Sequence, residues 1–289
     1  MQIPPSELIL NKDGSIYHLN LLPKDIATTI ITVGDPARVS EVSKNFDSID
    51  IKKGKREFVT HTGVLNGKRI SVISTGIGTD NIDIVLNELD ALVNIDFATR
   101  TVKENRIRLK IVRIGTSGAI QPEISIGSFL MSEYAIGFDG LLHFYQHSFD
   151  HHQQLEDAFI EHTQWAKEKA RPYIVDFDAD LAVKLMDNRI RLGFTATNTG
   201  FYGPQGRELR IAPSQADIMS KMTSFNHANK RITNLEMETS GIYVLAKLLG
   251  HQAVSLNCIL ANRVTGEFSK QPEKAVQELI QLTLAKLTS

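Results

Sequence analysis

The 289-residue sequence contains almost no cysteine, which limits both how the chain is stabilised and where it is expected to work. Cys258 is the only cysteine, so no disulfide can form within the chain. Secreted proteins commonly rely on disulfides, whereas a chain without them is typical of a reducing compartment. The sequence also begins without a basic segment followed by an apolar core, the pattern of a secretory signal. We therefore expect a cytoplasmic protein.

Long apolar runs and an excess of one charge are absent as well. No uninterrupted apolar stretch approaches the length of a membrane span, so no contact with a membrane is expected. Thirty-two Lys and Arg balance 33 Asp and Glu, for a formal net charge of −1. A balanced chain has no global basic field that would attract nucleic acid, and none is expected as a partner. Any anion-binding site must therefore be local.

Hydrophobic residues make up 42% of the chain and charged residues 22%, as in a globular protein that can bury a sizeable core. Short β-branched runs alternate with helical patterns, and this order predicts an α/β fold containing a βαβ unit. We find no repeat, low-complexity tract or interdomain linker. A single domain over residues 1–289 is expected.

Residues Lys110–Gln121 are the stretch around which the chain can be interpreted. Lys110–Ile114 reads as a buried strand, and Gly115–Gly118 reads as a polar turn at its end. Open α/β sheets bind ligands at such strand ends. Arg113 offers a planar set of donors, and Thr116 and Ser117 offer hydroxyls, so the composition suggests a phosphate site. The alternative, an ordinary turn, stays open at this point.

A second strand, predicted at Thr28–Val33, ends at Gly34-Asp-Pro-Ala-Arg38. Pro36 suits the first turn of a helix that Asp35 would cap, so Arg38 and the free backbone N–H groups of the helix would face the same space. This is a second candidate oxyanion site.

The middle of the chain supplies more of the scaffold. Asn66-Gly67 predicts a hairpin between Phe58–Leu65 and Arg69–Ser74. A helix capped near Thr79 or Asp80 follows, with an apolar face of Ile82, Val85, Leu86, Leu89 and Leu92 or Val93. Further helices are predicted over Leu155–Lys169 and Ala179–Met186, and at the C-terminus. Strands are predicted at Ser128–Tyr134, Leu192–Asn198 and Ala253–Leu260.

Two later segments carry further candidate residues. The loop Thr199–Arg207 combines the aromatic face of Phe201 with the amide of Gln205 and the guanidinium of Arg207, which suits a planar heterocycle. Asn234–Ser240 is predicted to start a helix. Glu236 and Glu238, on either side of Met237, would either interact favourably with its dipole or receive a sugar diol.

Six of these motifs occur in an order that resembles the hexameric or trimeric nucleoside phosphorylase family, and specifically its uridine phosphorylase branch. The resemblance extends from about His18 to the C-terminal helix. It implies an α/β domain with a mixed, distorted barrel-like central sheet flanked by helices. The motifs are Gly34-Asp-Pro-x-Arg38, Arg56-Glu-Phe58, Ser74-Thr-Gly-Ile-Gly78, Arg113-Ile-Gly-Thr-x-Gly-Ala-Ile-Gln121, Gln205-x-Arg207 and Glu236-Met-Glu238.

The resemblance also implies a role for each candidate residue in the phosphorolysis of uridine to uracil and ribose 1-phosphate. The catalytic residues would be Arg113, Glu238 and Arg207. Phosphate, a co-substrate, would bind Gly34, Arg38, Arg113 and Thr116, with Arg56 coming from a neighbouring subunit. Ribose would contact Ser117, Glu236, Met237 and Glu238, with His18 contributed across a dimer interface. Uracil would contact Gly118, Phe201, Gln205, Arg207, Leu260 and Ala261.

The family resemblance also sets expectations for partners. No metal or organic cofactor is implied; some relatives hold potassium at an interface, but Asn81 stands where they have serine. Because His18 and Arg56 would complete a neighbouring site, a homo-oligomer of at least a dimer, and by resemblance a hexamer, is expected.

The departures from the family pattern decide between the alternatives. Purine-specific relatives carry an aspartate after the last strand, where this chain has Asn262-Arg263, so uridine is preferred over inosine or adenosine. Ser117 replaces a common threonine and keeps the hydroxyl. A purine nucleoside phosphorylase, a hydrolytic nucleosidase and a non-catalytic nucleoside-binding protein of the same fold remain as alternatives.

Overall fold

The two strands predicted to end in anion sites lie side by side in the computed structural model, which describes residues 2–289. β1 (Thr29–Val33) pairs in parallel with both β7 (Lys110–Ala119) and β4 (Lys68–Ser74). The chain passes from β4 to β7 through α2 (Thr79–Asn94), as the βαβ pattern predicts. Because the three strands are parallel, the loops that follow them meet at one edge of the sheet.

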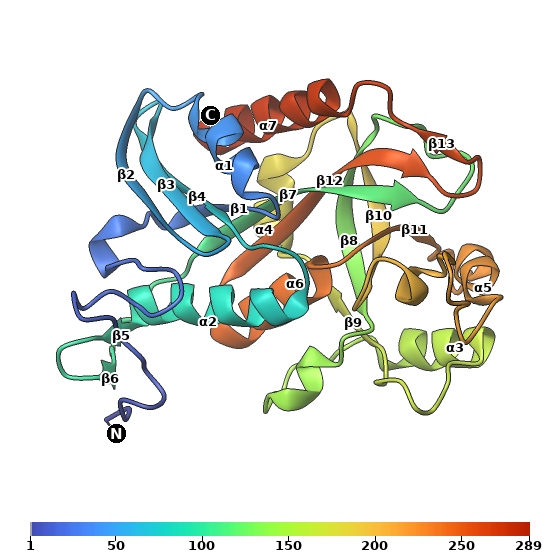
Figure 1. Ribbon diagram of the computed structural model, residues 1–289, viewed down its shortest axis with the longest axis horizontal. Helices are drawn as coiled ribbons and strands as arrows, with labels where there is room; N and C mark the ends of the chain where they lie inside the picture. Colours follow the sequence, from blue (N-terminus) through green and yellow to red (C-terminus); the bar gives the residue numbers. More distant parts are fainter. Residues whose placement is uncertain (1) are drawn as a thin grey trace.

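Part of the 11-stranded sheet closes into a barrel (Figure 1). β7 pairs in parallel with β12 (Gln252–Asn262), which pairs with β8 (Phe129–Gly137) in antiparallel fashion. From β8 the order continues through β10 (Ile190–Thr197) and β11 (Ile232–Glu236), and β11 returns to β7. The predicted mixed, barrel-like α/β fold is therefore confirmed.

The remaining strands extend this barrel. The sheet continues from β1 and β4 into β3 (Phe58–Leu65) and β2 (Ser48–Lys55). The predicted hairpin joins β3 to β4, and its two turn residues adopt the positive φ angles expected of Asn-Gly, 50° and 73°. The short additions are β9 (Tyr173–Asp176) on β8, β13 (Glu267–Phe268) on β12, and the separate pair β5 (Ile95–Asp96) and β6 (Thr101–Val102).

The helices cover the sheet in three groups, each with its own apolar cluster (Figure 1). One group contains α2 and α6 (Thr239–Leu249), which pack against each other. A second contains α1 (Pro36–Ser43), α4 (Ala179–Leu185) and α7 (Pro272–Thr288). The third contains α3 (Gln153–Thr163) and α5 (Ile218–Ser224). The predicted apolar face of α2 is fully buried.

Three expectations about where strands and helices begin or end were wrong. Gly115–Gly118 is not a turn, because β7 continues through it to Ala119, held by β12 on one side and β11 on the other. Asn234–Ser240 does not begin a helix, since β11 occupies Ile232–Glu236 and α6 begins only at Thr239. The helix predicted over Leu155–Lys169 ends at Thr163, where Gln164 turns to a left-handed conformation.

Two further points concern the helices. Neither Thr79 nor Asp80 caps α2, since Gly78 precedes it at a φ of 95° without a side-chain cap. Among residues 2–289, no helix is both long and apolar enough to cross a membrane.

Candidate active site

A cavity of about 800 Å³ opens where β1, β4, β7 and β12 end. Its lining comes from segments that are distant in the sequence, including the loop before α5 and the junction between β11 and α6. The structure brings together fourteen of the predicted site residues there: Gly34, Arg38, Arg113, Thr116, Ser117, Gly118, Phe201, Gln205, Arg207, Glu236, Met237, Glu238, Leu260 and Ala261.

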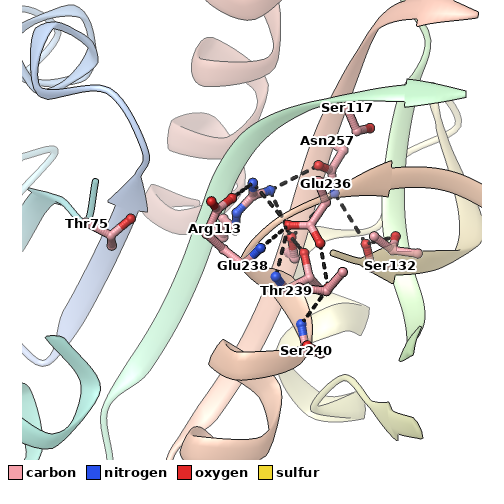
Figure 2. Close-up of polar contacts among 12 residues, drawn as sticks. Thr75, Arg113, Ser117, Ser132, Glu236, Glu238, Thr239, Ser240 and Asn257 are labelled. Atoms are coloured by element: carbon pink, nitrogen blue, oxygen red, sulfur yellow. Dashed lines mark hydrogen bonds and ion pairs between the residues drawn. The ribbon is translucent and has the colours of Figure 1, made fainter. Parts of the chain in front are cut away.

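Arg113 lies at the buried inner wall of this cavity, with only 5% of its surface exposed. Its Nη2 is 2.6 Å from Oε2 of Glu238 and 3.1 Å from Oε2 of Glu236, and its Nη1 donates to Oδ1 of Asn257 at 3.0 Å (Figure 2). Burial opposes the charge of the guanidinium, but the two carboxylates outweigh it and raise the pKa of Arg113. The arginine is therefore a fixed cation, clamped from two sides before any ligand binds.

Gly115 makes this position of Arg113 possible. The arginine side chain lies over residue 115 of the same strand, and a Cβ there would lie 1.9 Å from Nη1 of Arg113. The glycine, read from the sequence as a flexible turn residue, is instead required within a strand because another side chain occupies its space.

Glu236 and Glu238 differ in what they hold. Glu236 Oε2 accepts the backbone N–H groups of Glu238 and Thr239, and its Oε1 accepts the hydroxyl of Thr197 (Figure 2). This carboxylate thus occupies the N-terminus of α6, the helix-dipole position considered from the sequence. Glu238 Oε1 accepts the N–H of Gly78 at 2.8 Å, tying the start of α2 to the same site.

The pKa of Glu238 is raised, chiefly by burial, and the charge of Glu236 adds to this while Arg113 opposes it. A carboxyl held in this way can accept hydrogen bonds from a sugar diol without ever leaving its ion pair.

Arg38 differs from Arg113 in having no polar partner. Within residues 2–289 its guanidinium makes no hydrogen bond or ion pair, although it is partly buried and lines the cavity. Burial lowers its pKa, and the positive charge of Arg113 lowers it further. An anion placed between the two guanidinium groups would relieve both effects. The start of α1 lies beside it, with Asp35 accepting the N–H of Ala37 as the predicted cap.

The opposite end of the cavity is formed by the loop after β10. Arg207 Nη1 donates to Gln205 Oε1 at 2.5 Å and to the carbonyl of Phe201 at 2.7 Å. The guanidinium carbon of Arg207 lies 3.8 Å from the centroid of the Phe201 ring, so it covers one face of the aromatic ring predicted to stack on a base. Burial, followed by the charge of Arg263, lowers the pKa of Arg207 to about 10. Among residues 2–289, this end of the cavity lining therefore offers a cation and an amide but no carboxylate.

Two predicted residues lie outside the cavity of this chain. Arg56 is exposed in the two-residue turn between β2 and β3, at a φ of 56°. His18 Nδ1 lies 2.7 Å from Oε1 of Glu88, on the outer side of α2. That both residues serve a neighbouring subunit stays a prediction.

Asn262 and Arg263, on which the choice of base was argued, also lie outside the cavity lining. Asn262 is 2% exposed; its Nδ2 donates to the carbonyls of Gln121 and Ile124, and its Oδ1 accepts from Val264 and Thr265. It therefore holds the loop after β12. Arg263 Nη1 donates to the carbonyl of Gln205 at 3.0 Å and so supports the loop that carries Gln205 and Arg207.

Sequence reasoning did not assign Glu57, Gly76, Ile77 and Asn81, which also line the cavity. Gly76 has a φ of 71°, and a Cβ there would lie 2.4 Å from Nδ2 of Asn81 and 3.0 Å from Cγ of Glu57. The Thr75-Gly-Ile-Gly78 motif was the available signal. The motif could not show that Glu57, in the turn between β2 and β3, lies against Gly76.

The profile of the phosphorylase superfamily matches residues 28–288 of the sequence. The chain belongs to this family. It is 31% identical to a uridine phosphorylase of Thermococcus kodakarensis, over 91% of this chain and 83% of that protein. A uridine phosphorylase of Haemophilus influenzae is 28% identical, and the match covers 95% of this chain and 100% of that protein.

Solved structures of the phosphorylase superfamily support the same placement. A Trypanosoma brucei nucleoside phosphorylase, whose crystal structure is described as showing uridine phosphorylase activity, superposes with a TM-score of 0.88. It is 28% identical, and the comparison covers 97% of this chain and 99% of that one.

Proposed function

We propose that this phosphorylase catalyses the reversible phosphorolysis of uridine to uracil and ribose 1-phosphate. The observation that carries the proposal is the arrangement of one cavity. An unpartnered guanidinium lies at one end, a buried arginine–carboxylate cluster in the middle, and an amide and guanidinium without a carboxylate at the other end. The names of the relatives are consistent with this assignment.

The phosphate would bind between Arg38 and Arg113, with Gly34 and Thr116 beside it. In the reaction, a phosphate oxygen forms a bond to the anomeric carbon while the bond from that carbon to the base nitrogen breaks and its electron pair leaves with uracil. Positive charge develops on the sugar and negative charge on the base. Two arginines that bind and orient the phosphate lower the barrier by proximity as well as by charge.

The ribose would lie against Met237 and Glu238, with Ser117 beside it. The role of Glu236 is then indirect, since its oxygens hold the start of α6 and Arg113. Glu238 would accept hydrogen bonds from the sugar hydroxyls. Its negative charge would then lie near the positive charge that develops on the ribose ring, which stabilises the transition state more than the ground state.

The base would lie beside Gln205, Arg207 and Phe201, with Gly118, Leu260 and Ala261 around it. Arg207 stabilises the negative charge that appears on the oxygens of the departing uracil, so no acid that fully protonates the base is needed. The lack of a carboxylate at this end disfavours a purine nucleoside, whose departure is helped by protonation. The reaction needs no metal or organic cofactor, and phosphate is a co-substrate.

The test is the release of uracil from uridine with and without phosphate, alongside inosine. We expect release that requires phosphate and yields ribose 1-phosphate, with inosine a much poorer substrate. Equal release without phosphate would establish a hydrolytic nucleosidase, and faster turnover of inosine would establish a purine enzyme. Binding of uridine without turnover would leave a nucleoside-binding protein.

We further propose that the active unit is a homo-oligomer, either a dimer or a hexamer made of three such dimers, in which Arg56 and His18 complete the site of a neighbouring copy. Mixing two inactive variants tests this. Assemblies formed from Arg56→Ala and Arg113→Ala chains would contain some sites with both arginines intact, so partial activity should return. No recovery in verified mixed assemblies would place Arg56 in its own chain's site or outside catalysis. Action in the cytoplasm, in pyrimidine salvage, stays a prediction.

A further inference from the structure

The interior of the barrel contains a line of polar side chains that the proposed mechanism does not use. Ser132, Thr195, Asn234 and Asn257 project from four different strands and have no exposed surface. Buried polar groups inside a barrel are costly unless they are hydrogen-bonded to one another. These four connect two residues of the cavity wall, Arg113 and Ser117.

The connection is continuous. Arg113 Nη1 lies 3.0 Å from Asn257 Oδ1, and Asn257 Nδ2 lies 3.3 Å from Ser132 Oγ (Figure 2). Ser132 Oγ is 2.5 Å from Thr195 Oγ1, which is 2.9 Å from Asn234 Oδ1. Asn234 Nδ2 is 2.9 Å from Ser117 Oγ. We call these six residues the barrel chain.

The directions of the hydrogen bonds in the barrel chain follow from Arg113 at one end and from Asn234 at the other. Arginine only donates, so the oxygen of the Asn257 amide must face Arg113 and its NH₂ must face Ser132. Ser132 accepts that bond. At the other end, Asn234 accepts from Thr195 at Oδ1 and donates its NH₂ to Ser117. Thr195 has a single hydroxyl proton, which it gives to Asn234, so Ser132 is the donor in the contact between the two hydroxyls.

The last link determines what Ser117 can do. Its oxygen accepts from Asn234, and among residues 2–289 its own hydroxyl proton has no acceptor. Ser117 lines the cavity next to Thr116 and Gly118, on the side where the proposed function places the nucleoside. Because its oxygen already accepts from Asn234 while its proton is free, the hydroxyl is available to donate to a ligand in the cavity.

We propose that Asn257, Ser132, Thr195 and Asn234 are positioning residues, which fix Arg113 and orient Ser117 as a hydrogen-bond donor to an acceptor oxygen of the bound nucleoside. The inference rests on the proposed function for the identity of that ligand. The barrel chain polarises along its length because each link accepts at one end and donates at the other, so breaking an inner link weakens the outer one.

The central test is a double-mutant cycle between Thr195 and Ser117. Thr195→Val keeps the side-chain shape and removes the hydroxyl that transmits the polarity, without touching the cavity. We expect it to lower kcat/KM for uridine about tenfold, the effect of one lost hydrogen bond, with KM for phosphate unchanged. Ser117→Ala should cost about the same, and the double variant no more than either single one.

Two variants separate positioning from a purely structural role. Thr195→Ser keeps the hydroxyl and should restore kcat/KM. Thr62→Val is the matched control, because Thr62 is also fully buried and its hydroxyl pairs with Ser71 at 2.7 Å, in β3 and outside the barrel chain. It should lower the midpoint of thermal unfolding as much as Thr195→Val does and leave the kinetics unchanged.

If the losses in kcat/KM of the two single variants multiply in the double variant, the two residues act independently and the proposal is wrong. The proposal is also wrong if Thr195→Val has the same kinetics as Thr62→Val. Failure of the proposed function has a different signature, since the wild-type protein would then release no uracil from uridine. In that case the barrel chain is still tested by urea unfolding of the four proteins of the double-mutant cycle, which are the wild type, Thr195→Val, Ser117→Ala and the double variant. Additive changes in unfolding free energy for Thr195→Val and Ser117→Ala would show that the two residues are not coupled.

Discussion

The region around Arg113 and the region that would hold the base are built in opposite ways within the same cavity. Around Arg113, buried side chains from β7, β11, β12 and α6 leave almost no polar group without a partner. At the base end, Gln205 and Arg207 sit on an irregular loop whose Phe201, Tyr202, Leu209 and Ile211 are at least half exposed. The part of the reaction common to any nucleoside is placed on the rigid barrel, and recognition of the base is placed on a loop.

Replacing an arginine therefore has a different effect on stability in each of these two regions. Removing a partner from a buried ion cluster leaves uncompensated charge, whereas removing a group from a solvated loop leaves only a gap. Substitutions at the barrel end should therefore affect both stability and activity, and those at the loop end should affect activity alone.

The largest effect is expected for Arg113→Ala. Activity should fall by orders of magnitude, because the charge-assisted contacts to phosphate are lost. Glu236 and Glu238 would be left buried without their cation, at a cost of about 3–5 kcal/mol in unfolding free energy. Uracil release and urea unfolding measure the two effects. Near-normal turnover would refute the phosphate site, and an unchanged unfolding free energy would refute the buried cluster.

Arg38→Ala tests the other phosphate arginine, and it serves as the control for Arg113. Activity should fall about 10²-fold or more, mainly through KM for phosphate, because a charged contact to the anion is lost. Stability should change little, since the guanidinium has no protein partner to leave behind. A drop in unfolding free energy as large as that of Arg113→Ala would show that Arg38 has a structural task.

Arg207→Ala should lower kcat/KM for uridine by about 10²-fold, because one donor to the departing base is removed. The midpoint of thermal unfolding should stay within a degree or two, since the loop around it is solvated. Phe201 is half exposed and stays accessible to water, and the buried Gln205 loses only one neutral hydrogen bond. An effect confined to KM for phosphate would show that the base lies elsewhere.

Asp139→Asn should have the smallest effect on stability. It tests whether the buried hydrogen bonds at the start of α6 contribute to stability through Asp139. Asp139 accepts from Ser240 Oγ and Tyr173 Oη, and burial raises its pKa above the ordinary 3.8. A carboxyl with a raised folded-state pKa contributes stability that is complete below its unfolded value and is lost as pH rises through the folded value. The wild type should therefore lose some stability as pH rises from about 4, and Asp139→Asn should lose less. Parallel pH profiles of unfolding would contradict this.

Much of the fold was readable because local patterns and tertiary structure agree. Asn66-Gly67 fixed a hairpin, Asp35-Pro36 fixed the start of α1, and the apolar spacing along α2 fixed its buried face. Where the local pattern and the tertiary structure disagree, the prediction from the sequence was wrong. Gly115–Gly118 has the composition of a turn, but pairing with β11 and β12 keeps it in a strand. The need for glycine at 115 lies in the side chain of Arg113, which no local pattern displays.

The sequence by itself predicted fourteen of the residues that line one cavity, and these come from five separate segments of the chain. Only the tertiary structure decided what those residues do to one another. It clamps Arg113 between two carboxylates, leaves Arg38 without a partner, assigns Glu236 to the start of α6, and gives Asn262 a loop to hold. The physical reason is that hydrogen bonding and burial depend on distances between segments far apart in the chain, and closure of the barrel sets those distances.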